Sequence, residues 1–483
     1  MPQAITGYLV VRGKIKAMDR AILGTRMSDV KSDRRLSILL KTALLLFAVS
    51  ITLSVNAVKL SAGPLPLRSV FLLGSGAILF LAMPKKIFVT FAHCWRILLV
   101  LLFAALLGVF TSILSHADIV QVTIQVFEIH VQAAIGIIIV YTLVLHFGPR
   151  VIIATFLAAL AFSAIFAVGQ ALGVNAAWEA RAIIGRLSND TAATQDIYIS
   201  RARAMGLAYS PVLFATHTCL AIAALFAWRA LSTDPHKNRS IDWALLVGCL
   251  IFGLLAAVTG NRSPLLGMAI FFAIYFALRA PGLLLIVLPA LLLASVAAQP
   301  ILESMDDAGV RVASTDDGSA VGRTTLRNYG WMLVQARPMG YGLTFDSMRY
   351  AEQFFSQLRY EDGPQRVRQW PVHNYFLLLL GKYGFFILAL IPIILPTSRA
   401  TLFLWLGFVP YIVHIYFHNE GPLQSDFLIF FILAAVINIA RTNTARMQAQ
   451  SGADEAQGRR WRRAFAPAAR RGNASGHISG QAA

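Results

Sequence analysis

The sequence predicts an all-α polytopic membrane protein, and three observations carry that prediction. Of its 483 residues, 57% are hydrophobic and only 13% are charged, which is more apolar side chain than a soluble fold can bury. Apolar runs of about 20 residues, long enough to cross the roughly 30 Å hydrocarbon layer, recur along the chain. Because lipid offers no partner to backbone N–H and C=O groups, each run is expected to be an α-helix.

The first expected helix follows a basic arm. Residues 1–37 carry eight Lys/Arg and no long apolar run, so residues 38–58 are expected to be a retained span, not part of a cleaved signal peptide. About twelve spans are expected in all, near residues 38–58, 66–83, 97–114, 119–145, 151–172, 208–228, 241–258, 263–279, 281–298, 373–395, 400–417 and 423–440.

Basic residues in the short connections indicate the orientation of the bundle. They fall on one side, which the positive-inside rule makes cytoplasmic: Lys85, Lys86, Arg96, Arg150, Arg229, Lys237, Arg239, Arg279 and Arg399. The arm 1–37 and the tail 441–483, which is rich in Ala, Gly, Arg and Gln and expected to be disordered, belong to the same side. The net charge of +19 owes much to these termini and gives no indication of a nucleic-acid partner.

The opposite, outer face is expected to carry two long connections. The first, residues 173–207, joins two helices of the group 1–9 (38–298). The second, residues 299–372, joins that group to helices 10–12 (373–440). Loops of such length in a compact protein are usually either functional or disordered.

The longer connection has a helical pattern and therefore does not resemble a disordered loop. In FDSMRYAEQFFSQLRYEDG, the apolar residues Phe345, Met348, Phe355 and Leu358 follow one another at intervals of three or seven residues, about one or two helical turns. They therefore share one face, which predicts an amphipathic helix that caps the bundle or lies in the interface.

The sequence contains no motif that is typical of a cofactor or metal site. The three cysteines, Cys94, Cys219 and Cys249, fall outside the long outer connections, so neither a disulfide framework nor a cysteine metal site is expected. There is no C-x-x-C, Walker loop, nucleotide fingerprint or H-E-x-x-H. We therefore expect neither a cofactor nor a metal.

Three polar segments meet the membrane on the outer face. RARAMGLAYSP contains Arg203, VTGNRSP contains Asn261 and Arg262, and WPVHNYF contains His373 and Asn374. Each precedes a predicted span, and the amides and dipole of a helix N-terminus favour anions. Arginine grips phosphate oxygens bidentately, so the segments fit a phosphorylated substrate, although an arginine-rich surface with ion pairs would fit equally.

These segments resemble the O-antigen ligases and polymerases of bacterial surface polysaccharide assembly. The similarity rests on the Arg-x-x-Gly element from Arg203 to Gly206, the Asn-Arg turn, the Gly-Arg, Trp, Pro and Gly-x-Gly pattern of GRTTLRNYGWMLVQARPMGYGLTF, and HNYFLLLLGKYG. They occur in the family's order over roughly residues 200–390. Asn261 stands where a Ser is more usual.

The resemblance implies metal-independent glycosyl transfer on the periplasmic face of the inner membrane, from an undecaprenyl-pyrophosphate-linked glycan to a sugar hydroxyl. Arg203 and Arg262 are expected to stabilise the pyrophosphate leaving group, and His373, with an ordinary pKa near 6.5, to accept the hydroxyl proton. The residues expected to bind substrate are Asn374, Arg323, Arg337 and Asn261.

The acceptor stays open between two members of this class. Arg311 and Gly322 fit an Arg-x10-Gly spacing discussed for some polymerases, but the first long connection contains no matching copy. The preferred expectation is a repeat-unit polymerase for exopolysaccharide or O-antigen, with a flippase and a chain-length regulator as partners. The alternative is a ligase that joins O-antigen to lipid A-core in lipopolysaccharide biosynthesis. A transporter or flippase of lipid-linked glycan is the alternative of another class; the sequence lacks the half-to-half repeat that many transporters show.

Structural roles would also explain several of these residues. His373 and Asn374 would serve as a helix cap, and Arg262 as an anchor that reaches the headgroups. Within the predicted spans, ionisable residues are unusual and so of functional interest: Glu128, His130 and His217. At the outer end of the eleventh span, three more would line a groove: His414, His418 and Glu420.

Overall fold

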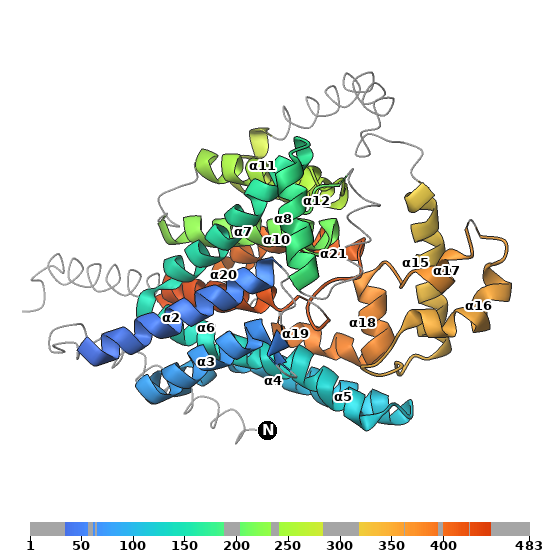
Figure 1. The fold of residues 1–483 in the computed structure, drawn as a ribbon, viewed down its shortest axis with the longest axis horizontal. Helices are drawn as coiled ribbons and strands as arrows, with labels where there is room; N and C mark the ends of the chain where they lie inside the picture. Colours follow the sequence, from blue (N-terminus) through green and yellow to red (C-terminus); the bar gives the residue numbers. More distant parts are fainter. Residues whose placement is uncertain are drawn as a thin grey trace, which may run out of the picture.

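The described part of the computed structural model is almost entirely helical (Figure 1). It covers residues 34–56, 61–62, 65–187, 203–232, 241–283, 318–361, 363–394, 399–424 and 426–445. Its sheet is a two-stranded antiparallel pair, β1 (Ser61–Ala62) and β2 (Leu65–Pro66). The predicted all-α class is confirmed. Most of the basic arm, the tail from residue 446, and Arg311 lie outside the described residues.

The helices follow one another along the chain through mostly short connections. In order they are α2 (Arg34–Val55), α3 (Leu67–Ala82), α4 (Pro84–Leu114), α5 (Ile119–Val126), the π-helix η1 (Phe127–Val131), α6 (Gln132–Phe147), α7 (Pro149–Ala171), α8 (Asn175–Leu187), α10 (Pro211–Ser232), α11 (Trp243–Ala257), α12 (Ser263–Arg279), α15 (Gly318–Ala336), η2 (Ser347–Tyr350), α16 (Ala351–Leu358), α17 (Arg366–Gln369), α18 (Tyr375–Tyr383), η3 (Phe385–Leu390), α19 (Ile391–Ile394), α20 (Arg399–Trp405), η4 (Leu406–Phe408), α21 (Val409–Tyr416) and a last helix, Leu428–Ala445.

Among the described residues, six helices are long and apolar enough to cross a membrane, or seven if one bent pair is counted as a single span. Four shorter apolar helices coincide with further predicted spans: Leu67–Ala82, Trp243–Ala257, Ser263–Arg279 and Leu402–Tyr416. The expected span at 281–298 falls almost wholly outside the described residues. A multi-pass membrane protein is therefore supported, and the number twelve stays a prediction.

The expected span at 373–395 is not one continuous helix. α18 ends at Tyr383 with Gly384 as its C-cap, and the chain continues through η3 and α19 with a bend of 106°. Residues of the long connection insert at the break: Tyr341 N–H donates to the Gly381 carbonyl at 2.6 Å, and Phe385 N–H donates to the Pro338 carbonyl at 3.0 Å. In a continuous helix, Phe385 would bond to Gly381 itself. The predicted span at 373–395 is therefore bent in the middle, because these backbone groups bond to the Pro-Met-Gly-Tyr-Gly turn instead.

Small residues bring the central helices together. α10 packs against α7, α11 and α21, and α12 packs against α21; the bundle is seen in Figure 1. On α12, a Cβ added at Gly267 would lie 2.7 Å from Pro410 Cα on α21. Such close backbone approach is how helices associate in lipid, where the hydrophobic effect contributes little between them. It places the starts of α10 and α12 beside the end of α21.

The described part of the long connection forms a helical unit with its own small core. Leu326, Tyr329, Leu358 and Val367 are buried in it, and α15 packs against α18 (Figure 1). The predicted amphipathic helix is confirmed as η2 followed by α16, although Met348 remains 37% exposed. The unit therefore covers the start of α18.

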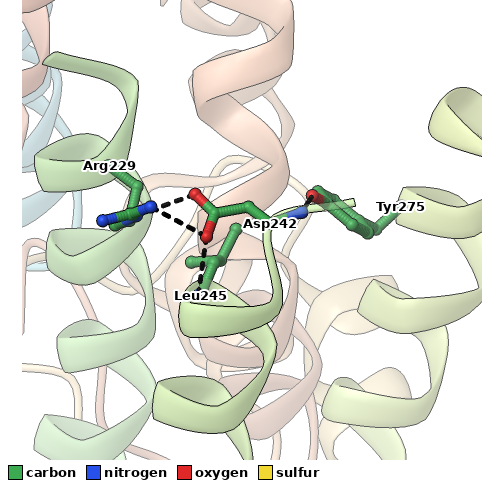
Figure 2. Close-up of polar contacts among 4 residues, drawn as sticks. All are labelled: Arg229, Asp242, Leu245 and Tyr275. Carbon is green, nitrogen blue, oxygen red and sulfur yellow. Dashed lines mark hydrogen bonds and ion pairs between the residues drawn. The ribbon is translucent and has the colours of Figure 1, made fainter. Parts of the chain in front are cut away.

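The two ends of the bundle carry different polar groups. At one, shown in Figure 2, Asp242 caps α11 and binds Arg229, whose Nε lies 2.7 Å from Oδ2, while the Asp242 N–H donates to Tyr275 Oη at 3.1 Å. We call this the Arg229 end. The opposite end, where α10, α12 and α18 begin and α21 ends, is the His373 end.

Candidate functional site

The segment before α10 is shaped by α7. Gly206 has a φ of +59°, and a Cβ there would lie 2.6 Å from the Ser163 carbonyl oxygen, so a larger residue would be strained. Gln170 Oε1 accepts hydrogen bonds from Met205 N–H and Gly206 N–H, both at 2.9 Å, and its Nε2 donates to the Gly206 carbonyl at 2.8 Å. The glycine of the Arg-x-x-Gly element thus fits a rigid turn that fixes Arg203.

Arg203 is held against the turn between α11 and α12. Its Nε donates to the Thr259 carbonyl at 2.9 Å, and a terminal nitrogen donates to Asn261 Oδ1 at 2.6 Å. Asn261 is buried, and its Nδ2 donates to the Pro211 carbonyl at 3.2 Å and to Thr259 Oγ1 at 2.8 Å. The structure therefore gives Asn261 a positioning role for Arg203, and its expected contact with substrate stays a prediction.

Arg262 follows directly and occupies the N-cap position of α12 with an exposed side chain. The amides of the first helical turn lie beside it, and a helix N-terminus with a guanidinium suits an anion. Asn261 therefore lies next to both arginines: it accepts a hydrogen bond from Arg203, and Arg262 follows it in the chain.

Ser263 connects this turn to the end of α21. Its Oγ lies 2.9 Å from His414 Nδ1 and 3.1 Å from His418 Nε2, and His414 Nε2 lies 3.3 Å from the Val212 carbonyl. A carbonyl only accepts, so His414 Nε2 carries a proton and, in the neutral ring, Nδ1 accepts from Ser263. Ser263 then accepts from His418, so three buried side chains form one directed hydrogen-bond chain.

His373 lies in the connection just before α18, half-buried beside Trp370. Its Nδ1 lies 2.7 Å from the Pro371 carbonyl oxygen, which requires the proton on Nδ1 and leaves the lone pair on Nε2. Burial, and to a smaller extent the positive charge of Arg323, lower the pKa of His373, against the Pro371 hydrogen bond, which raises it. A neutral imidazole with Nε2 as acceptor is the form that a general base needs.

Several of these groups influence the charge of His418. Burial and then nearby cationic or ionisable groups hold the pKa of His418 well below its usual value; those groups are His414, Arg323, His373 and Arg203. Arg203, Arg323 and His373 therefore lie within electrostatic reach of His418, and Arg262 is next to Ser263 in the chain. No group of three or more His, Cys, Asp or Glu side chains suited to a metal occurs among the described residues.

Arg337 and Asn374, which were expected to bind substrate, make contacts within the protein fold. Arg337 donates to the Leu114 carbonyl at the end of α4 at 2.9 Å and lies over the Tyr341 ring, a favourable place for a cation because carbonyls end the helix there. Asn374 is the N-cap of α18, and its Oδ1 accepts from Leu377 N–H at 3.0 Å. Their expected contacts with substrate stay predictions.

Two residues of this end of the bundle were not predicted from the sequence: Ser263, which directly follows the Asn-Arg turn, and Tyr209, which lies in the segment after Arg203. The sequence also gave no link between the arginines and the histidines at 414 and 418. Tyr209 Oη donates to Glu420 Oε1 at 2.5 Å. The i, i+4 spacing in HIYFH was the available signal, because it places both rings on one helix face.

The ionisable residues inside the bundle lie in a separate place. His130 Nε2 lies 3.0 Å from Tyr383 Oη, beside the break after α18. Glu128 shares the π-helix η1 with His130, and π-bulges are frequent at functional sites. His217 is buried within α10. Their roles stay open.

Comparison with known protein families gives a match that covers most of the site but does not include Arg203. Residues 247–392 match the family model described as O-Antigen ligase. The match runs from α11 to α19 and includes Asn261, Arg262, Arg323, Arg337 and His373. Over these residues, the match supports the family that the motifs indicated. No curated protein matches the chain.

Proposed function

We propose that this chain, a member of the O-antigen ligase and polymerase family over residues 247–392, is an inner-membrane glycosyltransferase of surface polysaccharide assembly. It transfers a glycan from undecaprenyl pyrophosphate to an acceptor sugar hydroxyl on the periplasmic face. The family implies a glycosyltransferase; the observation that supports this reaction is the hydrogen bond from Arg203 to Asn261, which joins the Arg203 segment to the turn that carries Arg262.

In the proposed reaction, the acceptor oxygen attacks the anomeric carbon, and the bond from that carbon to the pyrophosphate oxygen breaks. The electron pair leaves with the lipid pyrophosphate, whose negative charge Arg203 and Arg262 stabilise. The hydroxyl proton passes to His373 Nε2, the ring nitrogen that carries the lone pair. Because guanidinium groups supply the positive charge, the transfer needs no metal.

The proposed orientation places the His373 end in the periplasm, since the basic connections lie at the Arg229 end. Reporter fusions after residue 235 and at the C-terminus should indicate cytoplasm, and one near residue 316 should indicate periplasm. A cytoplasmic signal from residue 316 would separate the site from its donor and contradict the proposal.

Between the two acceptors, we propose a repeat-unit polymerase for exopolysaccharide or O-antigen, working with a flippase and a chain-length regulator. A ligase to lipid A-core is the alternative. Deletion of the gene followed by gel analysis of surface glycan separates them: a single repeat unit on lipid A indicates a lost polymerase, and long glycan on the carrier with bare core indicates a lost ligase. Unchanged glycan would contradict both.

A transporter of lipid-linked glycan is the second candidate, and one observation favours it. α18, the first part of the broken helix, carries Lys382, which is only 8% exposed and lies next to the contact between Tyr383 and His130. Broken helices with polar residues line many transport sites. If this cluster were the working site, Lys382→Met should abolish surface glycan while Arg262→Lys leaves it unchanged. We expect the opposite result, in which Arg262→Lys lowers the amount of surface glycan more than Lys382→Met does.

A further inference from the structure

Two buried carboxylates lie six residues apart at the His373 end and differ in how they are bonded. Asp426, 3% exposed, accepts from Leu428 N–H at 3.0 Å and from Tyr411 Oη at 2.8 Å, one bond to each oxygen. Glu420, 7% exposed, accepts from Tyr209 at Oε1, while its buried Oε2 has no hydrogen-bond partner among the residues that the structure describes. A buried polar atom without a partner is rare and requires an explanation.

Glu420 is fixed between the two segments that carry the proposed machinery. Tyr209, which donates to it, belongs to the same turn as Arg203. The following residue, Gly421, packs so closely on Tyr375 that a Cβ would lie 2.5 Å from the ring, and Tyr375 Oη donates to the Pro422 carbonyl. Tyr375 begins α18, two residues after His373. The carboxylate is therefore held on both sides, by the Arg203 segment and by the His373 segment.

We propose that Glu420 Oε2 accepts a hydrogen bond from a sugar hydroxyl of the bound glycan and so positions the sugar ring at the transfer site. Tyr209 is the positioning residue that fixes the carboxylate. This inference rests on the proposed function, since it assigns part of the same site. A carboxylate accepts from hydroxyls through charge-assisted bonds, which are about twice as strong as neutral ones.

The surroundings of Glu420 make this interaction depend on pH. Burial raises the pKa of Glu420 to about 7, with a smaller increase from Asp426 and an opposing effect from the Tyr209 hydrogen bond. The other ionisable groups that face this region are Tyr411 of α21, His418 of the same loop, and Arg68 of α3, which interacts with Tyr209. Glu420 is ionised above its pKa, so glycan binding should be strong above pH 7 and weaken as pH falls through 7.

The test is a kinetic comparison of Glu420→Gln with wild type in detergent micelles. The probe is the carrier-linked glycan extracted from cells in which the gene is deleted. We expect Glu420→Gln to raise KM about 10- to 100-fold, the range for a hydrogen bond to a charged group, to change kcat less, and to remove the rise of KM below pH 7. Tyr209→Phe should raise KM in the same direction by a smaller factor.

Asp426→Asn is the matched control, because it neutralises an equally buried carboxylate whose oxygens are already bonded. It should lower thermal stability and leave KM near the wild-type value. An active wild type whose KM is unchanged in both Glu420→Gln and Tyr209→Phe would overturn the inference and leave the proposed function standing, because Oε2 would then hold only water or its own proton. If Glu420→Gln does not fold, Tyr209→Phe decides alone. Wild type that transfers no glycan would contradict the proposed function itself.

Discussion

The Arg229 end and the His373 end of the bundle use the same kinds of side chain to different effect. At the Arg229 end, Arg229 donates to both oxygens of Asp242, which also caps α11. At the His373 end, Arg203 is held by an amide and a carbonyl, and Glu420 Oε2 has no hydrogen-bond partner in the described part of the chain. At the first end a guanidinium is paired with a carboxylate, whereas at the second a neutral amide and a backbone carbonyl position the Arg203 guanidinium.

This difference separates an ion pair that stabilises the fold from groups that suit a ligand. Neutral partners fix a guanidinium without cancelling its charge, so it keeps its attraction for an anion. A carboxylate partner, as at Arg229, removes most of that attraction. Exposed or partly exposed pairs of this second kind contribute about 1 kcal/mol or less to stability.

The largest expected effect at the His373 end belongs to His373→Gln. The variant keeps hydrogen bonding and approximate size but cannot accept a proton at neutral pH, so glycan transfer should fall by roughly 100-fold to 10,000-fold with normal protein abundance. Since burial lowers the pKa of His373, the fall in wild-type kcat as the ring is protonated should occur at a lower pH than for an ordinary imidazole. A Gln variant at the wild-type rate would make the imidazole a structural group.

Next in size are Arg262→Lys and Arg203→Lys. Each keeps the charge but loses bidentate contact with pyrophosphate, which should raise the barrier by about 2 to 4 kcal/mol, or on the order of 100-fold or more in rate. Initial rates in a reconstituted assay measure this. Wild-type rates in both variants would reduce the two arginines to structural anchors.

Ser263→Ala should have a smaller effect. It removes the hydroxyl between His414 and His418 and so loosens the turn that carries Arg262, with a loss of about 10-fold in kcat, or about 1.4 kcal/mol. Ser263→Thr, which keeps the hydroxyl, should recover part of it. Equal kcat in wild type and the Ala variant would show that the hydrogen-bond chain does not support transfer.

The smallest effect on transfer is expected at the Arg229 end. Asp242→Asn removes the ion pair but keeps a good N-cap, so the rate should stay within about twofold of wild type while stability falls by about 1 kcal/mol. Thermal unfolding of the detergent-solubilised protein measures the second quantity. A loss of transfer as large as that of Arg262→Lys would remove the distinction between the two ends.

Much of the fold followed from composition, because lipid leaves the helix as the main option for apolar runs. The break after α18 did not, since Phe385 bonds to Pro338 from a distant turn, and no local pattern of that apolar run encodes a tertiary partner. Arg203, Arg262 and His373 were found through their motifs. Glu420 and Tyr209 became linked only in the structure, because 211 residues separate the two partners of that hydrogen bond.

The most direct measurement is glycan transfer by purified protein in proteoliposomes containing the carrier-linked glycan, with EDTA present. We predict that wild type and Asp242→Asn transfer glycan at similar rates and that Arg262→Lys is slower by on the order of 100-fold. Transfer that disappears with EDTA, or an Arg262→Lys variant as fast as wild type, would contradict a metal-independent site built on the arginines of the His373 end.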